Sequence, residues 1–213
     1  MPKSFSRSLW LIPAMLFVTA SPAPAQDPVT EPKFIFDTGV PPWKGERLEL
    51  PPGFAPDLGW NGVEQIRFAP GMFNPEAPDF FSYVIAFLLS ADADASAEVL
   101  EKELLTYYRG LSKAVMDGKG QSVNAEKFTI SLEKAENSKS VPASAENVAA
   151  YTGTLNWTEP FATQQAQTLN LEIFVWNHGD QPVVFSCVSP AALEQEMPWK
   201  NLRDICSKFR LAP

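Results

Sequence analysis

The residue types that most often carry out catalysis are scarce in this chain. Its one histidine, His178, lies in Asn-His-Gly-Asp (177–180), a composition that predicts a hairpin turn. Nucleophilic hydrolysis needs a base beside the nucleophile. The sequence contains no Gly-x-Ser-x-Gly elbow and no glycine-rich phosphate loop. We therefore assign no catalytic residue and expect no cofactor, and a non-enzyme is the favoured class.

Acidic residues are the one reactive type present in number, with 25 Asp and Glu against 17 Lys and Arg. Asp92, Asp94 and Glu98 offer oxygen ligands, but their segment lacks the glycine and the terminal glutamate of a calcium loop. Acids just before a helix normally cap it or interact with its dipole, so we assign no metal site. A pair of catalytic carboxylates meets in space rather than in sequence. A carboxylate-dependent hydrolase therefore stays open as the alternative function.

Two cysteines, Cys187 and Cys206, are present. Two cysteines with one histidine cannot make the usual structural zinc site. Cys187 follows Val183 and Phe185 at a spacing of two and so shares their apolar face, whereas Cys206 lies on an expected closing helix. In an exported protein this arrangement predicts a disulfide, worth about 3 kcal/mol in the chain-entropy model, and the competing interpretation is two buried free thiols.

Aromatic residues beside turns give the only signal for binding. Trp60 precedes Asn-Gly, and Trp157 and Phe161 flank Thr-Glu-Pro. Exposed aromatic rings on loops often anchor a partner, so these three residues are candidates for contacting an unknown protein or glycan. The competing interpretation is that they cover the ends of the core.

The first residues predict an export signal. Lys3 and Arg7 precede the apolar run 9–20, and Ala23 and Ala25 occupy the small-residue positions of a cleavage site. The run is too short for a membrane-spanning helix, which needs about 20 residues. We expect cleavage after about Ala25, no stable membrane anchor after cleavage, and a periplasmic or secreted protein.

Composition predicts one folded domain after the signal. The chain has 213 residues, of which 45% are hydrophobic, and a formal net charge of −8. An acidic surface repels phosphate backbones, so nucleic acid is not expected as a partner. Half of the 20 prolines fall between residues 26 and 79. We divide the chain into a signal peptide (1–25), an extended proline-rich segment (26–44) and a single α+β domain (45–213).

Hydrophobic periodicity places the elements of that domain. The apolar run 80–90 predicts a buried central strand, and apolar residues spaced by three and four predict a long helix from Ser96 to Gly118. Alternating patterns predict further strands, and an amphipathic pattern predicts a closing helix. A helical turn is expected at Ser189-Pro190. Short hairpin connections predict a largely antiparallel sheet with both helices packed against it. The further strands are expected at 46–50, 65–69, 128–133, 147–157, 168–176 and 182–188.

This order of elements resembles the PsbP-like family of exported proteins, as does the ending Trp-Lys-Asn-Leu-Arg-Asp-Ile-Cys-Ser-Lys-Phe-Arg (199–210). The long proline-rich segment before Phe80 departs from the family pattern. The resemblance implies an α/β/α sandwich without a catalytic motif. It favours an exported, non-catalytic binding or scaffold protein of unknown partner. A further interpretation, a ligand carrier, requires an apolar cavity under the long helix.

Overall fold

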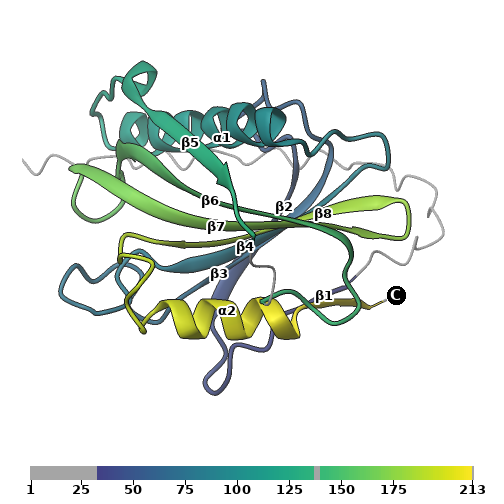
Figure 1. The fold of residues 1–213 in the computed structure, drawn as a ribbon. Coiled ribbons are helices and arrows are strands. Elements are labelled where there is room, and N and C mark those ends of the chain that lie inside the picture. The colour runs from purple at the N-terminus through teal and green to yellow at the C-terminus, as the bar shows by residue number, and fades with distance from the viewer. Residues whose placement is uncertain (1–32, 137–139, 213) are drawn as a thin grey trace, which may run out of the picture. The chain divides into compact units, whose positions relative to one another are not determined.

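The computed structural model describes residues 33–136 and 140–212, so the predicted signal peptide lies outside the described residues. One antiparallel sheet has the strand order β2-β3-β4-β8-β7-β6-β5, with α1 (Ala97–Gly118) on one face and α2 (Trp199–Lys208) on the other (Figure 1). The predicted α+β class, with a long helix and a C-terminal helix packed on a largely antiparallel sheet, is confirmed. The strands of this sheet are β2 (Lys44–Leu50), β3 (Gly62–Phe68), β4 (Tyr83–Leu89), β5 (Thr129–Lys134), β6 (Glu146–Thr158), β7 (Ala166–His178) and β8 (Gln181–Ser189).

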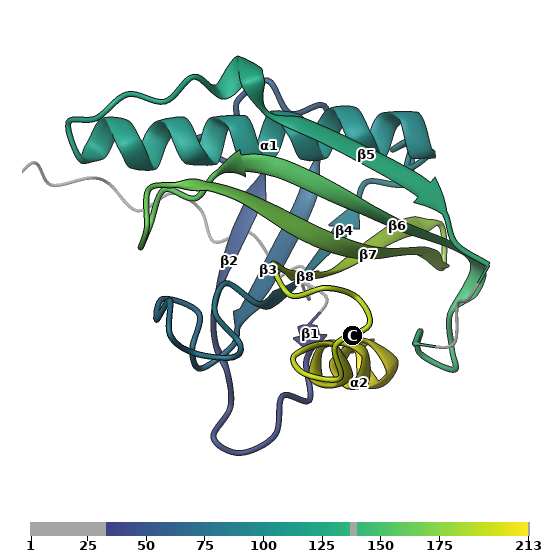
Figure 2. The same ribbon diagram turned by 60° about the vertical axis from the view of Figure 1, so that its left-hand side comes forward.

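The predicted central strand is β4, and all seven of its residues are buried. It pairs with β3 on one side and β8 on the other, while helices cover both faces of the sheet (Figure 2). The strand begins at Tyr83 rather than at Phe80, because Phe80 and Phe81 belong to a turn. Within that turn Phe81 has a φ of 49°, a conformation that a bulky side chain rarely adopts.

Alternation along the strands divides the core into two layers. On β8, Val184 and Val188 face α1, whereas Val183, Phe185 and Cys187 face α2. The remaining central strands divide in the same way, because successive side chains of a strand point to opposite faces. Each helix therefore covers its own apolar layer.

The long helix begins and ends where the sequence predicts. Ser96 is the N-cap residue, but its side chain makes no capping hydrogen bond. The Asp94 carboxylate instead accepts a hydrogen bond from the Ser96 amide at 2.8 Å. The buried stripe of α1 is wider than predicted and includes Tyr108 and Met116. Tyr108 packs against Trp157 of β6 and hydrogen-bonds Tyr83 of β4, while β5 runs alongside the helix (Figure 2).

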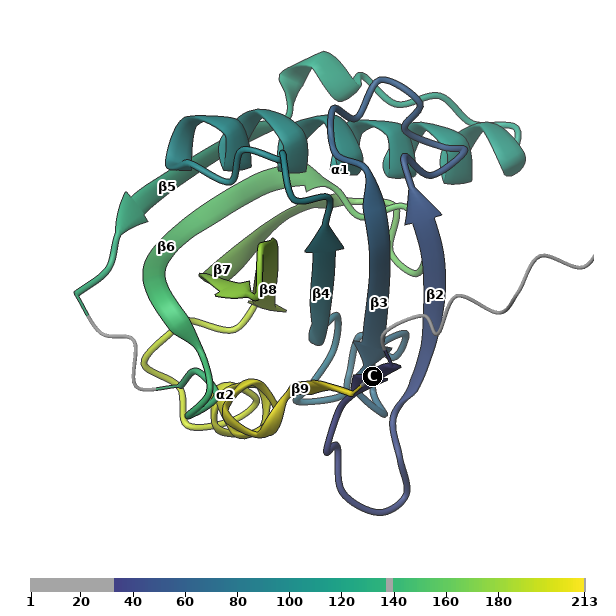
Figure 3. The same ribbon diagram turned by 90° about the vertical axis from the view of Figure 1, so that its right-hand side faces the viewer.

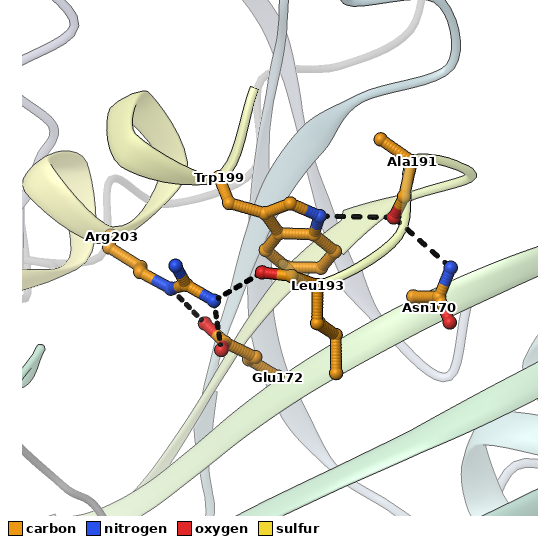
Figure 4. Close-up of polar contacts among 6 residues, drawn as sticks. All are labelled: Asn170, Glu172, Ala191, Leu193, Trp199 and Arg203. Atoms are coloured by element: carbon orange, nitrogen blue, oxygen red, sulfur yellow. Dashed lines mark hydrogen bonds and ion pairs between the residues drawn. The ribbon is translucent and has the colours of Figure 1, made fainter. Parts of the chain in front are cut away.

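A network of hydrogen bonds joins helix α2 to the sheet and to the segment that follows β8 (Figure 4). Arg203 donates two hydrogen bonds to Glu172 of β7, at 2.9 and 2.6 Å, and a third to the Leu193 carbonyl at 3.3 Å. The indole of Trp199 donates to the Ala191 carbonyl at 3.0 Å. These bonds pair Arg203 with the sheet and anchor α2 to it.

Two features at the edges of the fold differ from the predictions. Within the predicted proline-rich segment, β1 (Lys33–Ile35) pairs antiparallel with β9 (Arg210–Ala212) near the end of the chain. Strands of three residues are too short to show a period in the sequence. The helical turn predicted at Ser189-Pro190 is wrong: β8 extends to Ser189, and bends and turns follow. The Ser189 hydroxyl bonds the Ala191 amide and the Ser82 hydroxyl rather than capping a helix.

Candidate functional site

An apolar cleft of about 320 Å³ opens on the α1 face of the sheet, beside the helix. Helix α1 crosses near one end of β2 and β3, and the other ends of these strands extend away from it (Figure 3). The uncovered part of the strands forms the floor of the cleft. Its lining residues come from β2, β3, β4, β6, α1 and three connecting segments: Glu46, Leu48, Phe54, Glu64, Ile66, Phe68, Met72, Phe73, Phe81, Tyr83, Ile85, Tyr107, Leu111, Trp157 and Phe161.

Aromatic rings form the sides of this cleft. Phe54 packs edge-on against Tyr107 at a centroid distance of 5.0 Å. At the mouth, Phe73 lies 6.0 Å from both Phe68 and Phe161. Phe73 is 55% exposed, and Phe68 and Phe161 are half-buried. Large apolar side chains that remain open to solvent beside a cavity are typical of a ligand-binding surface.

Two backbone features bring the aromatic rings into place. Gly110 of α1 allows close approach of the segment that carries Phe54, because a Cβ at this glycine would lie 2.3 Å from the Phe54 carbonyl oxygen. Phe81 reaches the cleft from its left-handed backbone conformation. Backbone strain of this kind persists only where the surrounding structure enforces it, and it is often found at functional sites.

The segment that carries Phe161 is held in place by hydrogen bonds to a buried acid. Glu159 is fully buried and accepts hydrogen bonds from the Ala162 and Thr163 amides. From the end of α1, Lys119 donates to the carbonyls of Pro160 and Phe161, both at 2.7 Å. This side of the cleft is therefore preformed rather than assembled around a ligand.

The main polar group in the cleft is the carboxyl of Glu64 on β3, which is only 1% exposed. Its Oε1 accepts a hydrogen bond of 2.9 Å from the Tyr107 hydroxyl, whereas its Oε2 has no partner. Burial raises the pKa of Glu64 from 4.5 to about 7. The Tyr107 hydrogen bond lowers this pKa, and the charge of Glu46 raises it.

The other buried carboxylates are satisfied. Glu103 receives the Gly59 amide on one oxygen and Lys102 on the other, and both oxygens of Glu159 accept hydrogen bonds. In the described part of the chain, the buried side-chain polar atoms without a partner are Glu64 Oε2 and Ser186 Oγ. Only Glu64 lines the cleft. An unpaired buried acceptor is costly, and each one calls for an explanation.

Tyrosine hydroxyls surround the same region. Tyr83 and Tyr108 share a short hydrogen bond. Burial raises the pKa values of Tyr83, Tyr107 and Tyr108 well above the ordinary tyrosine range. These hydroxyls therefore stay neutral at physiological pH.

A second groove, of about 640 Å³, continues outward from the cleft. The two spaces share Glu46, Phe68, Met72 and Phe73, and the outer groove then runs past Trp43 and Pro70. An elongated molecule that enters the inner cleft therefore has a largely apolar path to the surface, whose charged lining residues are Lys44 and Glu46.

The structure places the three predicted binding residues differently. Trp157 is buried and Phe161 half-buried, and both line the cleft. Trp60 is also buried, but it lies elsewhere and donates its indole N–H to the Asp94 carbonyl at 3.1 Å. Contact of these residues with a protein or glycan partner stays a prediction.

The predicted disulfide is not formed, and this corrects the sequence analysis. Cys187 and Cys206 are free thiols, both buried in the layer under α2. Their proximity is as predicted, because they interact with each other. Burial first, and then this contact, raises the pKa of Cys187 well above the ordinary thiol range. The two residues act as small apolar side chains of the core, which was the competing interpretation.

Among residues 33–136 and 140–212, no group of three or more His, Cys, Asp or Glu is placed to hold a metal ion. Asp94 uses its carboxylate to bond the Ser96 amide. No helix in the same ranges is long and apolar enough to span a bilayer.

Sequence reasoning missed Glu64, although the pattern of β3 contains a signal for it. Glu64 shares a strand face with Ile66 and Phe68, so a charged residue interrupts an otherwise apolar face. Its partner Tyr107 is 43 positions away on α1, and no local pattern connects the two residues.

No protein-family model and no curated protein matches the chain. Among solved structures, it is similar to the crystal structure of LpqN, described as involved in cell envelope biogenesis of Mycobacterium tuberculosis. The identity is 12%, the match covers 85% of this chain and 92% of LpqN, and the TM-score is 0.30.

Proposed function

We propose that this chain is an exported, non-catalytic binding protein, and that it holds a small, largely apolar ligand in the cleft beside α1. The observation that carries the proposal is the preformed cleft itself, lined by aromatic rings and open at Phe73. Ligand pockets are typically concave and mostly apolar, with a few polar groups that orient the ligand. Glu64 and Tyr107 are such groups here. An apolar cavity beside the long helix is also what a ligand carrier requires.

Export is part of the proposal and rests on the charged start, the short apolar run and the Ala-Pro-Ala end of the leader. The intact mass of protein recovered outside the cytoplasm should correspond to a chain that begins at Gln26 or within a few residues of it. A mass that includes Met1 would contradict it.

A carboxylate-dependent hydrolase is the second candidate, and one observation favours it. Glu64 has a pKa raised to about 7, which is typical of a general acid, and Glu46 lines the same cleft. The lining residues contain no serine, threonine, cysteine, histidine or lysine to act as a nucleophile or a further base. Loss of a measured hydrolytic activity in both Glu64→Gln and Glu46→Gln would favour the enzyme.

Binding is tested with phenylbutanol, a neutral probe with an aromatic end. Trp157 lines the cleft, so its fluorescence should change when the probe binds, and calorimetry should give a saturable isotherm. The variant Leu111→Trp fills the cleft from α1 and should weaken binding at least tenfold. Ala114→Trp adds the same indole at an exposed position of the same helix and should leave binding unchanged. Equal binding by both variants would contradict the proposed site.

A further inference from the structure

We propose that the cleft selects a cationic ligand, an organic amine whose ammonium group pairs with Glu64 while its apolar body lies among the aromatic rings. This inference rests on the proposed function, because it names the chemical class that the same cleft takes. It is supported by the charge of the lining residues, the unpaired oxygen of Glu64 and the aromatic composition of the cleft.

All the charged residues that line the inner cleft are acidic. It contains two carboxylates, Glu46 and Glu64, and no lysine, arginine or histidine. The two acids share one face of neighbouring strands: Glu46 is paired with Ile66, and Glu64 is paired with Leu48. They are therefore diagonal neighbours, and each disfavours the ionised form of the other. A cation in the cleft reverses this repulsion, whereas an anion adds to it.

The hydrogen-bonding capacity of Glu64 fits an ammonium group. An ionised carboxylate only accepts hydrogen bonds, and an ammonium group only donates them. Glu64 lines the cleft; its Oε1 already accepts a hydrogen bond from Tyr107, and its Oε2 is buried and unpaired. Burying an ionised carboxylate is costly unless it is paired and hydrogen-bonded. A bound ammonium supplies both the missing charge and the missing donor.

The aromatic rings favour the same class of ligand. Cations are attracted to the faces of aromatic rings, and such contacts are a recurring way to bind organic ammonium groups. Six of the lining residues are Phe or Trp, and two more are tyrosines. The outer groove then continues the apolar surface past Trp43, so the body of an elongated amine extends outward from a head group at Glu64.

The same groups predict how binding depends on pH. Tyr107 and Tyr108 of α1 and Tyr83 of β4 act electrostatically with Glu64, and all three stay neutral because burial raises their pKa values. Glu46 of β2 is the other charged group that acts on Glu64. Glu64 therefore controls the effect: amine binding should be strongest above pH 7 and should weaken up to about tenfold per pH unit below it.

Three probes with one body and different head groups test the inference: phenylbutylamine, phenylbutanol and phenylbutyrate. With the full mature chain at pH 8, calorimetry should show the amine binding at least tenfold tighter than the alcohol, and the carboxylate binding weakest. Lowering the pH to 5 should weaken the amine and leave the alcohol unchanged. An alcohol or a carboxylate that binds as tightly as the amine would overturn the inference.

The Glu64→Gln variant keeps the shape of the side chain and removes its charge. It should reduce amine affinity at least tenfold and remove the preference for the amine over the alcohol. Glu103→Gln, a buried acid outside the cleft, is the control and should change neither. If the amine preference persists in Glu64→Gln, Glu64 is not the counter-ion. If none of the three probes binds wild-type protein, the proposed ligand-binding function itself fails.

Discussion

Each face of the sheet carries a glutamate under a helix, and the two glutamates differ in how their carboxylates are hydrogen-bonded. Glu172, facing α2, receives two hydrogen bonds from Arg203 and is part of a closed polar network (Figure 4). Glu64, facing α1, receives one hydrogen bond from a neutral tyrosine and keeps an unpaired oxygen at an open cleft. The glutamate on the α2 face is thus paired with an arginine, whereas no counter-ion of Glu64 is seen among the described residues.

In a fold without a catalytic motif, the unpaired acid is the stronger indication of a functional site. Buried polar groups are normally paired, because an unpaired one costs stability. A group that keeps such a cost while it lines an accessible cleft is a candidate for meeting a ligand. Glu172, Glu103 and Glu159 are all held by donors from the protein and therefore act structurally.

The largest expected effect is a gain in the free energy of unfolding when the buried carboxyl of Glu64 is replaced by an amide. In the unfolded chain this carboxyl ionises near pH 4.5, but in the folded protein it stays protonated until the pH approaches 7. Its stabilising contribution is therefore complete below pH 4.5 and is lost as the pH rises to 7. Glu64→Gln does not ionise, so it should be more stable than wild type at pH 8, by up to on the order of 3 kcal/mol.

Urea unfolding at two pH values measures this effect. The stability difference between Glu64→Gln and wild type should be near zero at pH 4 and large at pH 8. Glu46→Gln, which alters an exposed acid of the same cleft, is the matched control and should show a much smaller pH-dependent difference. A stability difference for Glu64→Gln that is independent of pH would show that Glu64 is not buried as an uncompensated acid.

The second prediction concerns the ion pair between Arg203 and Glu172 on the α2 face. Arg203→Met keeps much of the side-chain bulk but leaves Glu172 without its cation. We expect a loss of about 2 kcal/mol in the free energy of unfolding at pH 7, because the pair is only partly exposed and doubly hydrogen-bonded. Glu172 would then resemble Glu64, as a largely buried acid without a counter-ion.

Lys200→Met is the matched control on the same helix. Lys200 pairs with Asp204, but both side chains are about half exposed, so the loss should be much smaller than that of Arg203→Met. Adding Glu172→Gln to Arg203→Met should restore part of the lost stability. If Arg203→Met and Lys200→Met reduce stability equally, the Arg203–Glu172 pair does not anchor α2 to the sheet.

The fold was largely predictable, because its elements carry strong local patterns. The apolar run of β4 and the spacing of Leu100, Leu104 and Tyr107 on α1 each indicate one structure. The hairpin at Gly179 was predictable as well, since it needs a residue that accepts a φ of 60°. The β1–β9 pairing was not, because contacts between the two ends of a chain leave no periodic signal.

The cleft was not predictable, because it depends on distances that the sequence does not fix. Periodicity indicates that a helix covers the sheet, but not that α1 leaves part of β2 and β3 uncovered. The aromatic residues illustrate the same limit. Trp60 and Trp157 both lie beside turns, yet only Trp157 lines the cleft. Turn chemistry identified the residues, whereas the packing of α1 decided which of them lie beside Glu64.

The smallest expected effect on stability concerns the open rim of the α1 face. Phe73 is 55% exposed, and its ring packs in tilted geometry beside Phe68 and Phe161. Phe73→Ser should therefore cost less than about 1 kcal/mol of stability, since exposed aromatic contacts contribute little. The same change should weaken phenylbutylamine binding about threefold, because the ring separates the apolar body of the ligand from water. Met197→Ser removes an equally exposed apolar side chain outside the cleft and should change neither quantity appreciably. A cost above 2 kcal/mol for Phe73→Ser with no change in affinity would mean that Phe73 closes a core rather than bounding a ligand site, and the two faces of the sheet would then be alike.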